Sequence, residues 1–214
     1  LQFLFELPAR LKKCIEMKAY GQAVRYYTKA RTVLHQYQHM PSFNSIQLDC
    51  NDIIAELRTH LREQFRDNES TPKQLAECVD LLMQLKEPAD ELCDEFLSHS
   101  QQKLDEDLAE MEAQLQLKRE GSPNLPTTDS KEIEQALRNI PMDVLEFIDT
   151  SCNTFLSNMC LVIATYKELF VNRQATADCK QQELDKIAHD KLGKFVNSRM
   201  ELYFNYVTER VEAE

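Results

Sequence analysis

Glycine and tryptophan are scarce in this sequence. Three of the 214 residues are glycine and none is tryptophan, whereas glycine makes up about 7% of an average protein. Tight β-hairpins, β-bulges and phosphate-binding loops depend on glycine, because they use positive φ angles or a close approach of the backbone. The scarcity argues against a β-sandwich and against a nucleotide-binding α/β fold. The many Leu, Glu, Gln, Ala and Lys residues, which lose little entropy in helices, predict an all-α protein.

Long apolar runs are also missing. The most apolar stretch, residues 160–164, is far shorter than the ~18 apolar residues of a membrane span. The sequence starts without Met and without a basic-then-apolar leader, so we expect an internal segment of a longer chain. Its 7 cysteines are odd in number and none forms a CxxC pair, which favours reduced thiols in the cytosol over disulfides or a zinc site.

The sequence motifs GxxxxGK[ST], GxGxxG, HExxH and GxSxG are absent, and each is tied to a particular catalytic or phosphate-binding geometry. His35 and His39 are four residues apart, but no nearby Cys or carboxylate completes the four ligands of a structural zinc site. The acidic run Asp105, Glu106 and Asp107 lacks the glycine turn of a calcium loop, so we expect a solvated helix face. We therefore predict a protein that is not an enzyme and has no cofactor, metal or small-molecule substrate.

Hydrophobic residues recur every three or four positions, which predicts amphipathic helices. We expect a first helical bundle over residues 1–119, a flexible linker over 120–130, and a second bundle or continuation with two long helices over 131–214. The first bundle is predicted to hold a hairpin over 8–37 and helices over 42–66, 72–86 and 88–119. The resulting fold class is an all-α, elongated stack of antiparallel helices joined by short turns.

Several residues predict helix starts. Pro8 is expected to open the first helix, Ser42 to cap the helix over 42–66, and Thr71 with Gln74 to form a capping box. The most regular pattern follows Pro141 and predicts a helix of ~45 Å. Its predicted buried stripe is Leu145, Ile148, Cys152, Phe155, Met159, Val162, Tyr166 and Leu169.

A last helix is expected over about 175–211. Gly193 inside it lowers helix propensity by up to ~1 kcal/mol, which suggests close packing or a kink. The apolar side of this helix is predicted to consist of Leu184, Ala188, Leu192, Phe195, Leu202 and Tyr206.

Charge is distributed unevenly along the chain, whose net charge is −11. Residues 8–31 hold seven basic residues against one acid, whereas residues 87–112 hold ten acids and one lysine. The basic segment predicts either a contact with an acidic partner or anionic lipid, or the solvated side of a hairpin. The acidic chain does not favour nucleic acid. The candidate contact residues are Arg10, Lys12, Lys13, Lys18, Arg25, Tyr26 and Lys29.

Residues 17–34, MKAYGQAVRYYTKARTVL, carry small and aromatic residues at positions typical of a tetratricopeptide helix. A repeat array should echo this pattern 34 residues later, and no such echo is present. A peptide-binding helical adaptor stays open as an alternative function, as does a helical module that binds anionic membranes.

The segment over residues 4–65 resembles subunits of multisubunit tethering complexes, in the region after their amino-terminal coiled coil. The hairpin LPARLKKCIEMKAYGQAV and the later YQHMPSFNSI resemble the Fat-free family of vacuolar-protein-sorting proteins in particular. AECVDLLMQLKEPADELCDEFL and FIDTSCNTFL continue the likeness along the chain. The resemblance implies a rod of stacked helical bundles without catalytic residues.

The resemblance also implies a role and a location. The Fat-free family supplies a subunit shared by the Golgi-associated retrograde protein (GARP) and endosome-associated recycling protein (EARP) complexes. These complexes tether endosome-derived vesicles at the trans-Golgi network or act at recycling endosomes. The implied partners are other tethering-complex subunits, with SNARE contact through a segment that precedes Leu1. The implied location is the cytoplasmic face of these membranes, with peripheral association at most.

Overall fold

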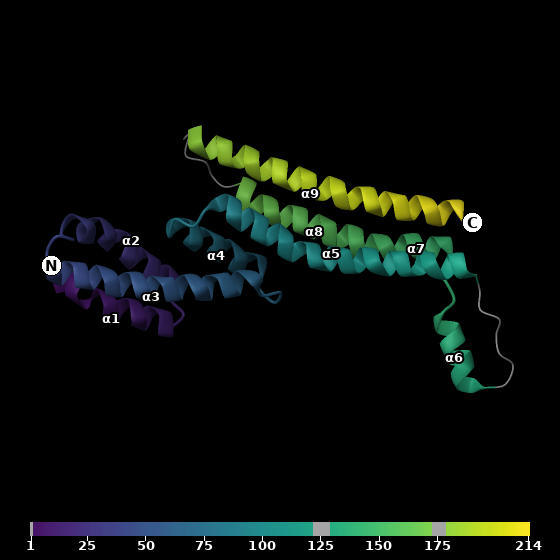
Figure 1. Ribbon diagram of the computed structural model, residues 1–214, viewed down its shortest axis with the longest axis horizontal. Helices are drawn as coiled ribbons and strands as arrows, with labels where there is room; N and C mark the ends of the chain where they lie inside the picture. The colour runs from purple at the N-terminus through teal and green to yellow at the C-terminus, as the bar shows by residue number, and fades with distance from the viewer. Residues whose placement is uncertain (1, 122–128, 173–178) are drawn as a thin grey trace. The chain divides into compact units, whose positions relative to one another are not determined.

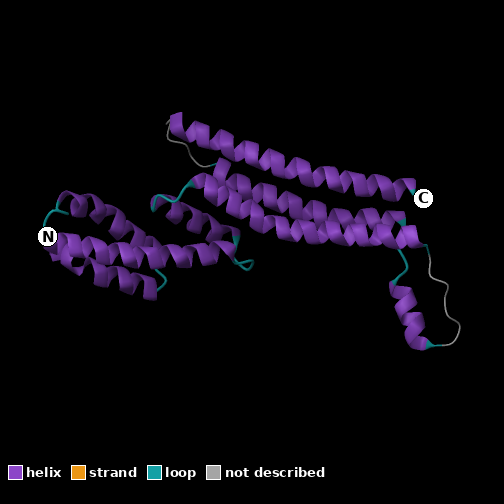
Figure 2. Ribbon diagram, viewed as in Figure 1, coloured by secondary structure: helices purple, strands orange, loops and turns teal. Residues whose placement is uncertain are grey.

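The computed structural model describes residues 2–121, 129–172 and 179–214, with the side chains of 179–181 left aside (Figure 1). Every regular element within these ranges is a helix (Figure 2). The all-α prediction is therefore confirmed. The chain divides into two compact units, Leu1–Leu92 and Cys93–Glu214.

The first unit is a set of amphipathic helices, 13 to 26 residues long, around a leucine-rich core. Helix α1 packs against α2 and α3, and α4 packs against α2 and α3. These helices are α1 (Gln2–Glu16), α2 (Tyr20–Gln36), α3 (Pro41–Arg66) and α4 (Pro72–Gln84). The most deeply buried core residues include Leu7, Leu11, Leu34, Ile54, Leu57, Leu61 and Leu82.

Two of the three predicted helix starts are wrong in this unit. Pro8 lies inside α1 rather than at its start, because Leu4 and Leu7 belong to the same buried stripe and extend the helix upstream. At α3, Pro41 takes the first helical position and Met40 is the N-cap, so the cap lies two residues ahead of Ser42. The capping box is confirmed: the Thr71 hydroxyl accepts from the Gln74 amide at 3.3 Å, and the Gln74 side chain accepts from the Thr71 amide at 2.8 Å.

The second unit holds three long helical segments and one short helix. Figure 1 shows α5, the helix containing α7 and α8, and α9 running alongside one another. The elements are α5 (Ala89–Glu120), α6 (Ser130–Arg138), α7 (Val144–Ser151), η1 (Cys152–Leu156), α8 (Ser157–Tyr166), η2 (Lys167–Val171) and α9 (Cys179–Glu212).

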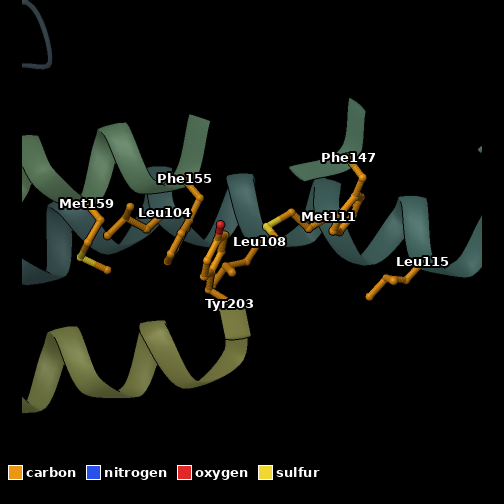
Figure 3. Packing of buried hydrophobic residues seen from close by; sticks show 8 residues of the cluster. All are labelled: Leu104, Leu108, Met111, Leu115, Phe147, Phe155, Met159 and Tyr203. Atoms are coloured by element: carbon orange, nitrogen blue, oxygen red, sulfur yellow. The ribbon is translucent and has the colours of Figure 1, made fainter. Parts of the chain in front are cut away.

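The boundary between the units differs from the predicted one at residues 120–130. The division follows Leu92, near the start of α5, because the apolar stripe of α5 packs within the second unit. Most of the predicted linker, residues 122–128, lies outside the described residues. The core of the second unit (Figure 3) is a cluster to which α5, α7, η1, α8 and α9 contribute. Its residues are Leu104, Leu108, Met111, Leu115, Phe147, Phe155, Met159 and Tyr203.

Two π-helical turns, η1 and η2, interrupt the helix that follows Pro141. A π turn places one extra residue in the turn and rotates the buried face. Phe147 and Ser151 are therefore buried ahead of η1, while Leu145, predicted to be buried, is 76% exposed. From Phe155 onward the predicted stripe and the structure agree at Met159, Tyr166 and Leu169.

Helix α9 also departs from its predicted apolar side. Ala188 and Leu192 are buried as expected, but Leu184 and Leu202 are exposed. Tyr203, one position beyond Leu202, takes the buried place because its ring packs on Phe155.

The helix Val144–Val171 is long and apolar enough, by length and composition, to cross a membrane; no other helix among the described residues is. The expectation from the sequence concerned unbroken apolar runs, and this segment contains none of about 18 residues. Thr, Ser and Asn residues interrupt the segment, so the sequence shows no unbroken apolar run. A core helix passes the same test, and Phe155 and Tyr166 on this helix are fully buried.

Candidate interaction surface

The structure gathers part of the predicted basic segment on the α1–α2 hairpin. Arg10 lies over the ring of Phe3, 5.4 Å from its centroid, and its Nη2 is 2.9 Å from a carboxylate oxygen of Glu6. This pairing holds the pKa of the Glu6 carboxyl below its usual value, with help from the Gln2 amide. The guanidinium is thus fixed against an aromatic ring at the surface.

Tyr26 joins the same group from α2. Its ring meets Phe3 edge-on at 5.9 Å, and its hydroxyl accepts a 2.7 Å hydrogen bond from Gln22. Arg25 donates to the other end of the Gln22 amide at 2.8 Å. Phe3, Arg10, Gln22, Arg25 and Tyr26 therefore form one connected cluster, which we call the α1–α2 cluster.

The remaining predicted contact residues lie outside this cluster. Lys12, Lys13, Lys18 and Lys29 are exposed and have no ion pair among the described residues. Such lysines are mobile point charges rather than an ordered site. The structure therefore joins three of the seven predicted residues and leaves four as separate surface cations.

Ion pairs connect α5 to α9, and the sequence pattern did not predict them. Lys191 Nζ lies 2.6 Å from Asp94, and Arg199 Nε lies 3.2 Å from Asp105. Asp107, predicted to be solvated, is buried and accepts a 2.6 Å hydrogen bond from Asn158. These contacts join residues more than 50 positions apart, and the spacing of residues within one helix cannot predict contacts between helices.

Comparison with known proteins gives a consistent result over the whole chain. The family model described as exocyst complex component Sec5 matches residues 1–212. The vacuolar protein sorting-associated protein 51 homologues of Danio rerio, Homo sapiens and Drosophila melanogaster are 45%, 42% and 32% identical over 100% of this chain. The chain belongs to the vacuolar protein sorting-associated protein 51 family. It spans 27%, 23% and 25% of those relatives, about a quarter of their length. No solved structure matches it.

Family membership confirms the resemblance seen in residues 4–65. The described residues contain no group of three or more His, Cys, Asp or Glu side chains able to hold a metal. Burial keeps two of the cysteine thiols in their neutral form. Burial raises the pKa of the Cys50 and Cys78 thiols to about 11, so neither is a ready nucleophile at neutral pH.

Two buried tyrosines, Tyr166 and Tyr203, are packing residues. Burial raises the pKa of Tyr166, whose hydroxyl donates a 2.6 Å hydrogen bond to the Ala188 carbonyl. Burial likewise raises the pKa of Tyr203. Both hydroxyls stay protonated at neutral pH. Through them Tyr166 contacts the Ala188 carbonyl of α9 and Tyr203 contacts the Cys152 sulfur of η1, so each tyrosine joins two helices.

Proposed function

We propose that this segment of a protein 51 homologue is a non-enzymatic scaffold and protein-interaction module of a multisubunit vesicle-tethering complex. The observation that carries the proposal is the similarity to protein 51 homologues over the whole chain. The match to Sec5 supports it, because Sec5 is also a component of a multisubunit complex. Long helices with few turns suit a scaffold, since they span distance with mostly local contacts.

The specific assignment is to the GARP and EARP complexes. In GARP the protein acts in endosome-to-trans-Golgi retrograde transport, and in EARP it acts in endosomal recycling. It works from the cytoplasmic face, as a peripheral component. Its partners are the other subunits, and SNARE contact uses a segment before Leu1.

The α1–α2 cluster is the contact surface that we assign to an acidic partner protein. Gln22 orders the Arg25 guanidinium at the surface, so Arg25 loses little side-chain entropy on binding a carboxylate. Arg10 lies over Phe3 beside it and already pairs with Glu6. Lys29, exposed on α2, adds a further positive charge to the same helix as Arg25.

A charge-reversal experiment tests this assignment. Full-length protein carrying Arg25→Glu and Lys29→Glu replaces the wild type in cells, and quantitative mass spectrometry measures the subunits that co-purify with it. We expect about tenfold lower recovery of at least one subunit, together with slower retrieval of a cargo from endosomes to the Golgi. Lys73→Glu with Lys131→Glu, two exposed lysines on α4 and α6, is the matched control and leaves recovery unchanged. Unchanged recovery with the test variant refutes the surface assignment.

The alternative function is direct binding to anionic membranes through the same cations. It predicts flotation of the protein with phosphatidylserine vesicles, weakened by salt and by Arg25→Glu with Lys29→Glu. Flotation that responds in this way, together with unchanged subunit recovery, favours the membrane function over the protein contact.

A further inference from the structure

The second unit has a small pocket between α5 and the helix that begins with α7 and η1. Its volume is about 60 Å³. Met111 of α5 and Phe147 of α7, both from the core of this unit (Figure 3), line the pocket together with Met142. The surface exposed inside it is mostly apolar. The pocket stays open because the side chains that the second helix contributes to its lining are short: Thr150, Ser151 and Thr154.

The wall at Met142 is held in place from two helices. The Met142 amide donates a 3.1 Å hydrogen bond to the Gln114 side chain of α5, and the Met142 carbonyl accepts a 3.0 Å bond from Arg210 of α9. Arg210 is 2% exposed, so the second bond is shielded from water. The pocket is therefore formed before any ligand arrives, which lowers the entropy lost on binding.

The charged residues that line this pocket are both acidic. They are Asp107 and Glu110 of α5, and the described lining includes no Lys, Arg or His. Asp107 is 7% exposed, whereas Glu110 is exposed and forms no ion pair with any described residue. A carboxylate next to an apolar wall attracts a cation more strongly than one in bulk water does. The pocket therefore suits a ligand with an apolar stem and a positively charged end.

The contacts of Asp107 favour lysine over arginine as that ligand. One carboxylate oxygen lies 3.2 Å from Lys103 Nζ, and the other accepts a 2.6 Å hydrogen bond from Asn158. A guanidinium pairs best with two free oxygens of one carboxylate, whereas an ammonium can use single lone pairs of Asp107 and Glu110.

The size of the pocket also fits a lysine. A water-sized atom needs about 10–15 Å³ of such space, so the pocket holds about four heavy atoms. Lysine has a stem of four methylene carbons, and such stems commonly lie along apolar surface with the charged end in a polar setting.

The charge of the pocket favours a protein over a membrane as the source of the cation. Membrane surfaces that recruit proteins by charge are anionic and attract basic segments, so they would be repelled by Asp107 and Glu110. A metal ion is not favoured either, because the described residues form no group of three ligands for one.

We propose that this pocket binds a lysine side chain of another protein subunit. The lysine stem packs against Met111 and Phe147, and its ammonium lies between Asp107 and Glu110. The inference rests on the proposed scaffold function and names one contact within it. It shares no residue with the α1–α2 cluster.

Two substitutions at exposed positions change the pocket while leaving the core intact. Thr154→Leu fills the pocket, and Glu110→Lys reverses the charge at its edge. Asn153→Leu and Glu201→Lys make the same changes at exposed positions outside the pocket and are the matched controls. We expect all four variants of the full-length protein to melt at the wild-type temperature.

Carbodiimide cross-linking then detects the lysine. The full-length protein is purified with its co-purifying subunits and treated with a carbodiimide, which joins a carboxylate to an amine in contact with it. Peptide mass spectrometry is expected to find Glu110 linked to a lysine of another subunit. Thr154→Leu should lower the yield of this link about tenfold by steric exclusion, and Asn153→Leu should leave it unchanged. Glu110→Lys should lower recovery of the linked subunit about tenfold, and Glu201→Lys should not.

Three outcomes overturn the inference. A link from Glu110 to a lysine of this chain, within one copy or between two, shows that the protein fills the pocket itself. A yield that does not respond to Thr154→Leu shows that the lysine lies outside the pocket. Absence of any link from Glu110, in a complex whose subunits co-purify normally, refutes the pocket contact but leaves the scaffold function standing. Failure of the wild-type protein to recover any subunit refutes the scaffold function and this inference with it.

Discussion

The ring of Phe155 stacks on the ring of Tyr203, with centroids 5.1 Å apart and planes 11° from parallel (Figure 3). Phe155 belongs to the π turn η1 and Tyr203 to the C-terminal half of α9. The stack therefore fixes the point at which these two helices cross. Leu104 and Leu108 of α5 complete the same core.

Truncating Phe155 is expected to destabilise the protein strongly. The side chain is fully buried, so Phe155→Ala loses transfer free energy and leaves a cavity, at a cost of about 3–5 kcal/mol. Urea unfolding followed by circular dichroism measures the loss. Leu161→Ala removes an exposed side chain of the same helix and should cost under about 1 kcal/mol. Equal losses for the two variants would contradict the core assignment.

The sequence pattern predicts some helices almost completely. One set of apolar residues in α3 recurs every three or four positions, and all of its members are buried: Phe43, Ile46, Cys50, Ile53, Leu57, Leu61 and Phe65. Periodicity works there because α3 is an uninterrupted α-helix with one partner-facing side.

Periodicity fails where the geometry or the partner changes. Leu145 was expected to be buried, but the π turn η1 shifts the face by one residue, and a π turn has no reliable sequence signature. The boundary between the units was also misplaced, because the apolar stripe of α5 has the same sequence pattern whichever unit it packs against.

The predicted contact residues Arg10, Arg25 and Tyr26 do share a cluster. Gln22 and Phe3, which join them, were missed because a connecting residue has no charge pattern of its own.

Glu87 is expected to stabilise the first unit through an ion pair with two arginines. Its carboxylate lies 3.2 Å from Arg58 Nε and also pairs with Arg62, both from α3. All three side chains are largely shielded from solvent, so Glu87→Gln leaves guanidiniums without a full counter-charge. The expected loss is about 1–3 kcal/mol in urea unfolding. Glu77→Gln, at an exposed site on α4, is the control, and an equal loss there would refute the role of the pair.

Lys86→Gly is expected to stabilise the turn after α4. Lys86 has a φ of 67°, and the amides of Lys86 and Glu87 donate to the carbonyls of Met83 and Leu82, each at 3.0 Å. This is the Schellman arrangement, in which glycine is the preferred residue. Glycine removes the strain energy of a left-handed backbone, but it costs more conformational entropy on folding than lysine. The net increase in the free energy of unfolding is expected to be about 0.5–1 kcal/mol.

The same substitution inside a helix should have the opposite sign. Lys12 is exposed in the middle of α1, and Lys12→Gly should cost about 1 kcal/mol. Differential scanning calorimetry of both variants measures the two shifts in melting temperature. A loss of stability with Lys86→Gly would contradict the strained turn.

The cysteines should differ widely in reactivity. Cys160 is exposed, whereas Cys50 and Cys78 are buried and burial raises the pKa of each thiol to about 11. Since the thiolate is the nucleophile, Cys160 should react with iodoacetamide at pH 8 at least about 100-fold faster than either buried thiol. Peptide mass spectrometry over a time course measures the rates. In urea the three rates should converge, and fast labelling of Cys50 in the folded protein would refute its burial.

Stability is expected to fall in alkaline solution because of the same two thiols. The pKa of Cys50 and of Cys78 is about 11 in the folded protein, against an ordinary value of 9.0. Above pH 9 the unfolded chain therefore loses these protons while the folded chain keeps them, and the free energy of unfolding decreases as the pH rises toward 11. Urea unfolding at pH 8 and pH 10 measures the decrease. Cys50→Ala with Cys78→Ala lowers stability at both values but should make the fall between them smaller. An equally steep fall in that variant would assign the alkaline loss to other groups.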